Sequence, residues 1–331
     1  MKWSVNTAVL EVVQAVWKGD LQIGLPSNQP IVVPPSPVQG LEKGTEMTEA
    51  QKEKFTEWKR MATRLYTADK ERISQGFQVS RILRMAAEYK EYEDFYYVWY
   101  ADFRGRLYSA TSGFSPQGPD MAKGCLRFAN GKPLGDRGWY WLRVHIANRF
   151  GYDKVSYDDR VRWVDDQRVA LLRTAEDPLS YRNVWANADK PYQFLAAVFE
   201  YAGACKLSDP GAYVSHLPIG LDGSCNGLQN FSAMLRDAAG GEATNLVPGE
   251  KPNDIYARVA DVTLRKIKER LGSDNVHIDV AGHSLTDHFF AERWLAYGID
   301  RKITKRPVMT LPYGATRQSC TEYIWEALVD K

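Results

Sequence analysis

Residues Leu217 to Asp237, "LPIGLDGSCNGLQNFSAMLRD", place one carboxylate, Asp222, between a short apolar run and a turn of small residues that opens a helix. A short apolar run ends at Asp222, and Gly223 and Ser224 then allow a tight turn and a close approach of the backbone to a ligand. We therefore expect a short strand, a turn that carries Asp222 at its rim, and a helix. The helix should pack back onto the strand through one side, made of Leu228, Phe231, Ser232 and Leu235.

The carboxylate of Asp222 has two possible roles at this position. An acid just before a helix accepts amide hydrogen bonds and suits the positive end of the helix dipole, so Asp222 could be a helix cap. An acid at the rim of a turn, beside exposed backbone carbonyls, could also be a ligand of Mg²⁺, which takes few protein carboxylates and completes its octahedron with water and phosphate oxygens. One acid alone makes a weak metal site.

A cluster of cations follows in "DRKITKRPVMTLPYG", residues Asp300 to Gly314. Arg301 and Lys305 are four residues apart, so a helix would present both on one face, as binding of a triphosphate requires. The alternative is an ordinary solvated charged face. Tyr313 favours a site because it adds a stacking surface near the cations. The two prolines of the stretch predict a kinked or short helix.

A third stretch, "ADFRGRLY", predicts a β-hairpin whose turn is at Gly105. Arg104 and Arg106 flank this glycine, and alternate arginines on a β-element would project to the same side and bind successive phosphates. An exposed hairpin without a ligand is the alternative.

The rest of the chain predicts a mostly helical α+β protein. Helical spacing is present in Asn6–Trp17, in 138–193 and in Asn253–Leu271, and prolines predict an extended connector over 24–44. Thr48 and Gln51 form a potential capping box at the start of a helix, and a second helix is expected at about Gln78–Tyr92. We expect these two to form an antiparallel pair or a projecting arm. We expect His145 to pack beside Leu142 and Ile146 in a helix.

Composition narrows the class of protein without naming it. The 331 residues carry 43 basic and 41 acidic side chains, so nucleic-acid contacts would depend on local clusters. Four dispersed cysteines and no apolar run of ~20 residues favour a cytoplasmic protein without disulfides. The 10 tryptophans and 18 tyrosines fit aromatic packing or stacking on sugars or bases. A glycosidase would need a pair of carboxylates that no feature of the sequence identifies.

Three stretches in the same order resemble one family. "DFRGRLYSATSGFSPQGPDMAKG", "LDGSCNGLQNFSAMLRD" and "RKITKRPVMTLPYG" are similar to the single-subunit DNA-directed RNA polymerases of T-odd bacteriophages and mitochondria. The resemblance covers nearly the whole chain and implies a right-hand fold of thumb, palm and fingers. It implies the end of an N-terminal region and the thumb at 1–93, the first part of the palm at 94–237, and the start of the fingers at 238–331.

The resemblance also implies roles for individual residues. Asp222 matches the first metal-binding aspartate, and Gly223 offers a backbone carbonyl to the metal. The nucleotide site is matched by several residues: Arg301 and Lys305 hold the incoming triphosphate, Arg306 helps, Tyr313 gates the insertion site, and Tyr256 lies near the entering nucleotide. Arg104 and Arg106 match the motif that holds the template and the RNA–DNA hybrid. Asp222, Lys305 and Tyr313 are the residues expected to act in catalysis.

The implied activity is DNA-templated RNA synthesis from NTPs, with Mg²⁺ as cofactor and with template or promoter DNA and nascent RNA as partners. Two metal ions ~3.5–4 Å apart would stabilise the attacking and leaving oxygens. The family's second catalytic aspartate lies in a segment that does not occur in this sequence. We therefore expect the chain alone to have little or no activity and to need the C-terminal portion of the polymerase as a partner.

Two hypotheses remain open from the sequence. The chain is part of a phage-type RNA polymerase, either truncated or one half of a split enzyme in an infected bacterial cell. Alternatively, it is a non-catalytic nucleic-acid-binding module that retains the binding residues. Complementation by the C-terminal portion distinguishes the two.

Overall fold

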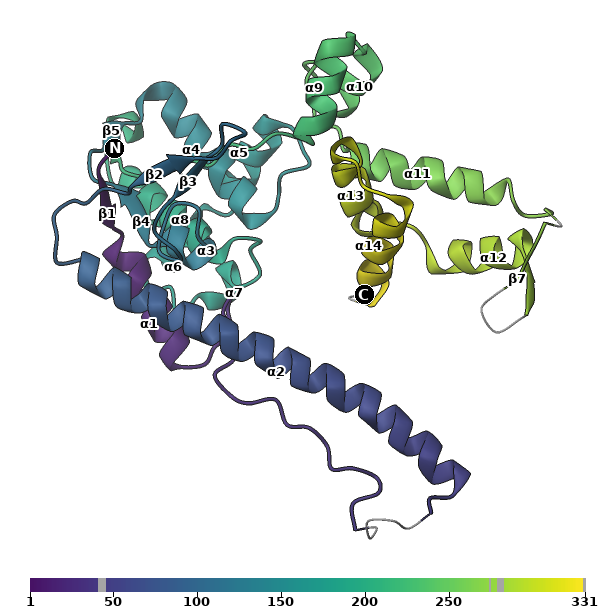
Figure 1. Cartoon of the computed structure of the whole chain (residues 1–331). Coiled ribbons are helices and arrows are strands. Elements are labelled where there is room, and N and C mark those ends of the chain that lie inside the picture. The colour runs from purple at the N-terminus through teal and green to yellow at the C-terminus, as the bar shows by residue number, and fades with distance from the viewer. Residues whose placement is uncertain (41–45, 274, 279–282, 330–331) are drawn as a thin grey trace. The chain divides into compact units, whose positions relative to one another are not determined.

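The computed structural model describes residues 1–40, 46–273, 275–278 and 283–329, and divides the chain into two compact units. The first unit contains Met1–Asp153 and Tyr157–Ile219, and the second contains Lys154–Ser156 and Gly220–Lys331. Both consist mainly of helices with short antiparallel strand pairs (Figure 1). The expected mostly helical α+β class is confirmed. In the described part of the chain, no helix is both long and apolar enough to cross a membrane.

The first unit is built around a buried helix. Its elements are β1 (Trp3–Val5), α1 (Thr7–Lys18), α2 (Glu49–Tyr89), β2 (Trp99–Ala101), β3 (Leu107–Ser109), α3 (Asp120–Gly124), β4 (Leu126–Phe128), β5 (Lys132–Pro133), α4 (Gly135–Phe150), α5 (Tyr157–Asp166), α6 (Arg168–Glu176), α7 (Arg182–Trp185), α8 (Pro191–Cys205), η1 (Pro210–Ala212) and β6 (Val214–Ser215). The central helix is α8, which contacts α1, α3, α4, α6, α7 and η1.

Three features explain the position of α8. Its sequence is apolar except for Gln193 and Glu200, and most of its residues are buried, as expected of a helix that is covered on nearly all sides. The carboxylate of Asp120 accepts hydrogen bonds from the backbone N–H groups of Tyr192 (2.8 Å) and Gln193 (3.3 Å) and so caps the helix. A Cβ atom on Gly124 would lie 2.7 Å from the backbone of Tyr192, so only glycine permits this approach of α3.

Aromatic residues form much of the core of the first unit. Trp185, Tyr192 and Tyr201 are fully buried, and the ring of Trp139 stacks on Tyr201 with 5.1 Å between centroids. Packing in the core therefore accounts for these aromatic side chains without a bound base or sugar.

The expected pair of helices after residue 48 is wrong in one respect. The capping box of Thr48 and Gln51 is present, but the helix that it begins runs without interruption to Tyr89 as α2 (Figure 1). The segment between the two expected helices contains no proline, and its single glycine, Gly76, costs only ~1 kcal/mol inside a helix. Trp58 donates a hydrogen bond to the Pro34 carbonyl (2.8 Å), which attaches the proline-rich connector to α2.

The other predicted helices of the first unit, and its hairpin, are confirmed. The helix after Asn6 is α1, and Asn6 caps it. The region 138–193 is mostly helical, and the hairpin turns at Gly105, where φ is +76°. Arg104 and Arg106 lie in the exposed turn itself instead of on the strands, because both backbone N–H groups donate to the Asp102 carboxylate at 2.9 Å.

The second unit has a much smaller core. Its elements are α9 (Asn226–Leu235), α10 (Ala238–Ala243), α11 (Ile255–Lys268), β7 (Val276–Ile278), β8 (Ser284–Thr286), α12 (Asp287–Tyr297), α13 (Arg301–Thr310), η2 (Leu311–Tyr313) and α14 (Arg317–Val329). Only Ala260, Ile299 and Ile303 form its buried hydrophobic cluster among the described residues. An apolar pocket of about 300 Å³ remains between α11, α12, α13 and α14.

Two predictions about the stretch after Leu217 are wrong. No strand leads directly into Asp222: β6 ends at Ser215, and residues 217–223 have no regular structure, since Pro218 lacks a donor for a strand ladder and Gly220 weakens a strand. The helix is present as α9, but Phe231 and Leu235 are exposed, at 45% and 75%. Small residues, Gly227 and Ser232, are the buried positions of this helix.

His145 is buried in α4, as expected, and it should make stability depend on pH. Burial, together with the nearby charge of Arg149, lowers the pKa of His145 to about 3. Below the unfolded-state pKa of ~6.5 the unfolded chain binds a proton that the folded chain does not bind, so the free energy of unfolding should fall by about 1.4 kcal/mol per pH unit from this group, until pH 3.

Urea denaturation of wild type and His145→Leu at pH 7 and pH 5 measures this contribution. The variant should lose less stability between the two pH values than wild type does. His288→Gln is the control because His288 lies on the surface of α12. Equal losses in wild type and in His145→Leu would contradict the prediction.

Candidate functional site

The Asp222 carboxylate is exposed and forms few contacts with the protein. Its Oδ1 atom accepts one hydrogen bond, from the backbone N–H of the next residue, Gly223, at 2.9 Å. It does not cap α9, because the N-cap position belongs to Cys225. The capping alternative is therefore wrong, and the carboxylate oxygens remain accessible to a ligand.

Neighbouring residues hold the turn that carries Asp222. Cys225 is buried and adopts a left-handed backbone conformation, with φ at +61°. Its thiol lies beside the Tyr256 side chain on α11, and burial followed by this neighbour raises the pKa of Tyr256 to about 12. The tyrosine therefore stays neutral at physiological pH and ties the turn to α11.

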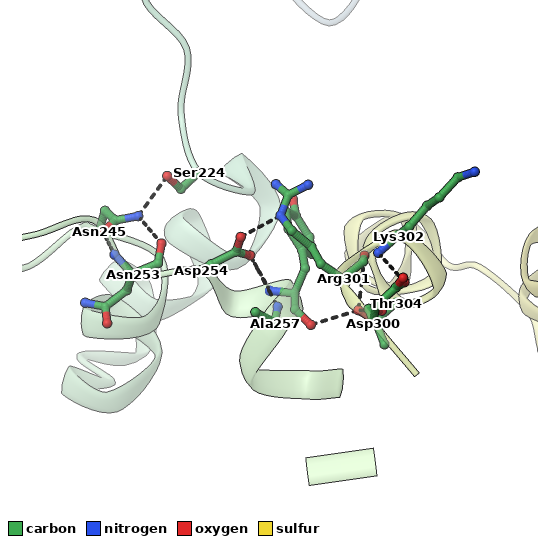
Figure 2. A network of polar contacts seen from close by, with 10 residues as sticks. Ser224, Asn245, Asn253, Asp254, Ala257, Asp300, Arg301, Lys302 and Thr304 are labelled. Atoms are coloured by element: carbon green, nitrogen blue, oxygen red, sulfur yellow. Dashed lines mark hydrogen bonds and ion pairs between the residues drawn. The ribbon is translucent and has the colours of Figure 1, made fainter. Parts of the chain in front are cut away.

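A polar network continues from the same turn. The side-chain amide of Asn245 donates to the Ser224 hydroxyl (2.9 Å) and to the Asn253 carbonyl (2.9 Å), and its oxygen accepts from the Asn253 N–H (2.6 Å). Figure 2 shows these contacts and their continuation to Asp254 and Arg301.

Asp254 joins α11 to α13. One carboxylate oxygen accepts from the N–H groups of Tyr256 (3.1 Å) and Ala257 (3.3 Å) and caps α11, and the other accepts from Nε of Arg301. Partial burial disfavours the charged carboxylate, but Arg301 and the two amides outweigh burial, so the pKa of Asp254 is lowered. Asp254 therefore carries a full negative charge at neutral pH.

Arg301 is also packed against an aromatic ring. Its guanidinium carbon lies 5.3 Å from the centroid of the Tyr256 ring, an attractive cation–π distance. One turn later, Thr304 donates to the Tyr256 carbonyl at 2.8 Å. The side of α13 that carries Arg301 is thus attached to the beginning of α11.

The expected helix of cations is confirmed as α13, which continues through Pro307 to Thr310. Lys305 is exposed and has no hydrogen-bond or ion-pair partner in the described part of the chain. Arg306 differs, because it pairs with Glu326 and lies over the Tyr323 ring at 4.1 Å, both on α14. A role for Arg306 in nucleotide binding would require it to release Glu326.

Tyr313 is 64% exposed in η2, directly after α13. Its position depends on α9: a Cβ atom on Gly227 would lie 2.7 Å from Pro312 and 3.5 Å from Tyr313. Asp222, Tyr256, Arg301, Lys305 and Tyr313 thus all belong to the second unit, whereas Arg104 and Arg106 belong to the first unit.

The described side chains supply one of the ligands that a metal site needs. Within residues 1–40, 46–273, 275–278 and 283–329, no three His, Cys, Asp or Glu side chains form a group able to hold a metal ion. Asp222 supplies one accessible carboxylate, and Mg²⁺ typically takes one or two protein carboxylates together with water and phosphate oxygens. The accessible carboxylate oxygens are of the ligand type that Mg²⁺ prefers.

Sequence reasoning missed Asn245 and Asp254. Asp254 could have been found as an acid just before the apolar spacing of α11, the usual signal of an N-cap. Asn245 had no comparable signal, because its left-handed φ of +60° and its contacts with Ser224 and Asn253 follow from tertiary structure.

Comparisons with known proteins agree on the family. The sequence profile of DNA-dependent RNA polymerase matches residues 132–331. The DNA-directed RNA polymerase of Enterobacteria phage T3 is 38% identical over 327 residues, and T7 RNA polymerase of Escherichia phage T7 is 38% identical over 331 residues; each match covers 95% of this chain and 36% of the relative. The mitochondrial DNA-directed RNA polymerase 1 of Arabidopsis thaliana is 33% identical and is covered to 32% of its length, over 100% of this chain.

The chain therefore belongs to the DNA-dependent RNA polymerase family. It spans about a third of the length of these relatives.

The close approach at Gly227 gives a prediction. Gly227→Ala should destabilise the second unit by ~1–3 kcal/mol, because the new methyl group meets the rigid ring of Pro312 and forces η2 away from α9. Gly220→Ala is the matched control, since a Cβ atom there meets nothing within 4 Å. Thermal unfolding followed by circular dichroism measures both, and equal melting temperatures in the two variants would contradict the predicted contact.

Proposed function

We propose that this chain is the part of a single-subunit, DNA-directed RNA polymerase that holds the first metal-binding carboxylate and the incoming NTP. Family membership supports RNA synthesis as the activity of the complete enzyme. The observation that carries the assignment is a continuous set of polar contacts, within one compact unit, from the turn of Asp222 to Arg301.

Within this proposal, each side chain has a task set by its chemistry. Asp222 and the carbonyl of Gly223 would bind Mg²⁺, and when bound, two such ions stabilise charge on the attacking and leaving oxygens. Arg301 and Lys305 would bind the triphosphate and neutralise charge that develops on the leaving pyrophosphate. Tyr313, and Tyr256 beside Arg301, would contact the entering nucleotide, with Tyr313 taking part in choosing ribonucleotides.

The larger organisation is also a proposal. Residues 1–93 would be the end of the N-terminal region and the thumb, 94–237 the first part of the palm and 238–331 the start of the fingers. Arg104 and Arg106 would hold template and hybrid, which suits their exposed positions in the hairpin turn. DNA, nascent RNA, NTPs and the C-terminal portion of the polymerase would be the partners.

Asp222→Asn tests the metal-binding role in this chain directly. Mn²⁺, a paramagnetic substitute for Mg²⁺, is titrated in the presence of ATP while water-proton relaxation reports binding. We expect the variant to bind Mn²⁺ at least ~10-fold more weakly, because a charged oxygen ligand is lost. Asp261→Asn, an exposed acid on α11, should behave as wild type. Unchanged Mn²⁺ affinity in Asp222→Asn would refute the metal site.

Complementation tests the activity of the whole. We expect the chain alone to synthesise little or no RNA, and addition of the C-terminal portion of a phage relative to restore Mg²⁺-dependent synthesis on a DNA template. The Asp222→Asn chain should not be restored. Salt-sensitive binding of primer–template without extension, even with that portion supplied, would favour the non-catalytic nucleic-acid-binding module instead.

The two neighbouring cations should differ in their effect on triphosphate binding. Lys305→Ala should weaken ATP binding by ~10–100-fold, the typical value of a charge-assisted hydrogen bond. Arg306→Ala should weaken it by less than ~3-fold, because Arg306 is already paired with Glu326. Isothermal titration calorimetry measures both affinities, and an Arg306→Ala loss as large as that of Lys305→Ala would show that the Glu326 pair opens when nucleotide binds.

A further inference from the structure

We propose that Asn245 and Asp254 are positioning residues that connect the Asp222 turn to the Arg301 guanidinium, so that divalent-cation binding and triphosphate binding strengthen each other through the protein. The proposal rests on the proposed function, because it assigns the metal to Asp222 and the triphosphate to Arg301. Neither Asn245 nor Asp254 contacts either ligand in the proposal.

The Asn245 side chain forms hydrogen bonds with two residues, Asn253 and Ser224. Its amide pairs with both backbone groups of Asn253 in a ring of two hydrogen bonds, at 2.6 and 2.9 Å, and its second N–H contact is the Ser224 hydroxyl at 2.9 Å. The backbone of Asn245 adopts a left-handed conformation, with φ at +60°, which asparagine tolerates better than most residues. Backbone and side chain together fix where Ser224 lies, and Ser224 is two residues from Asp222.

The contacts then pass through one peptide unit to Asp254. The Asn253 backbone that Asn245 holds is directly followed by Asp254, whose two carboxylate oxygens are divided between the start of α11 and Nε of Arg301 (Figure 2). A displacement of the turn at Ser224 would therefore be transmitted to Asn253 and to the carboxylate that orients Arg301.

The pairing through Nε orients Arg301 without using all its donors. Among the described residues, neither terminal nitrogen of Arg301 has a hydrogen-bond partner, and Figure 2 draws both without a dashed contact. Because the guanidinium is planar, fixing Nε on Asp254 and the ring face on Tyr256 fixes the direction of the two remaining nitrogens. Those nitrogens suit two-pronged binding of phosphate oxygens.

The test separates coupling through the protein from the direct bridge that a triphosphate makes to a metal. ATP affinity is measured by calorimetry with EDTA and with saturating Mn²⁺, and the ratio of the two affinities is the gain from metal. In Asn245→Asp, which loses both N–H donors, we expect the gain to fall by about 5- to 10-fold while metal-free ATP affinity stays within ~2-fold of wild type. Ser224→Ala should reproduce this result, and Ser224→Thr, which keeps the hydroxyl, should restore the gain.

Substitution of Asp254 should change the metal-free ATP affinity. In Asp254→Asn the charge that holds Arg301 is lost, so metal-free ATP affinity should fall by about 3- to 10-fold. Asn230→Asp is the matched control for Asn245→Asp, since it makes the same change at an exposed position of α9 in the same unit and should leave both affinities unchanged. Circular dichroism confirms that each variant is folded.

The outcomes distinguish this inference from the proposed function. If Asp222→Asn and Lys305→Ala leave binding unchanged, the proposed function fails. If those two act as expected but Asn245→Asp and Ser224→Ala both match Asn230→Asp, only the positioning inference is overturned. It is likewise overturned if Asn245→Asp lowers both affinities equally together with the melting temperature, because that is the result for a residue that only stabilises the fold.

Discussion

The placement of α13 on α11 in the second unit depends on the contact between Asp254 and Arg301, because the hydrophobic cluster between these helices is small. Its buried apolar cluster contains Ala260, Ile299 and Ile303, and an apolar pocket remains between the four helices around it. A fully buried aliphatic side chain contributes ~1.5–3 kcal/mol, but apolar contacts are non-directional, so this small cluster stabilises the unit without fixing one register of its helices. Directional contacts must therefore set the register of α13 on α11, and Asp254 and the Thr304 hydroxyl supply them.

The cations of α13 differ in how they are paired within the protein. Arg301 gives Nε to Asp254 and retains its other nitrogens, whereas Arg306 is held by Glu326 and by the ring of Tyr323. A partly exposed pair such as Asp254–Arg301 is weak in water, so the proposed binding of a phosphate to Arg301 would not have to overcome a strong internal contact. Orientation is obtained at low energetic cost.

Local features of the fold were predictable from the sequence, and long-range ones were not. The Thr48 capping box, the turn at Gly105 and the helix that carries Arg301 and Lys305 each follow from residues within a few positions of one another. The continuity of α2, by contrast, depends on the absence of a helix-breaking residue between its two halves. The spacing of apolar residues does not indicate where a helix continues.

The candidate site shows the same division. The contact of Asn245 with Ser224 spans 21 residues, and that of Arg301 with Asp254 spans 47, so neither leaves a spacing to recognise. The face of α9 was misjudged for a related reason. Large apolar residues were expected to pack, but the buried positions of α9 are Gly227 and Ser232, and η2 approaches Gly227 so closely that a Cβ atom there would lie 2.7 Å from Pro312.

These constraints explain how Asp222 can be positioned and yet remain exposed. In the proposed function the Asp222 carboxylate binds an ion, so its oxygens have to stay available. Among the described residues, the one hydrogen bond that it accepts comes from the N–H of Gly223. The next two residues hold the turn instead, Ser224 through Asn245 and Cys225 through Tyr256. Both contacts lead to the beginning of α11, where Asp254 holds Arg301. The acid and the cation are thus oriented by their neighbours, and their own charged atoms are left for a ligand.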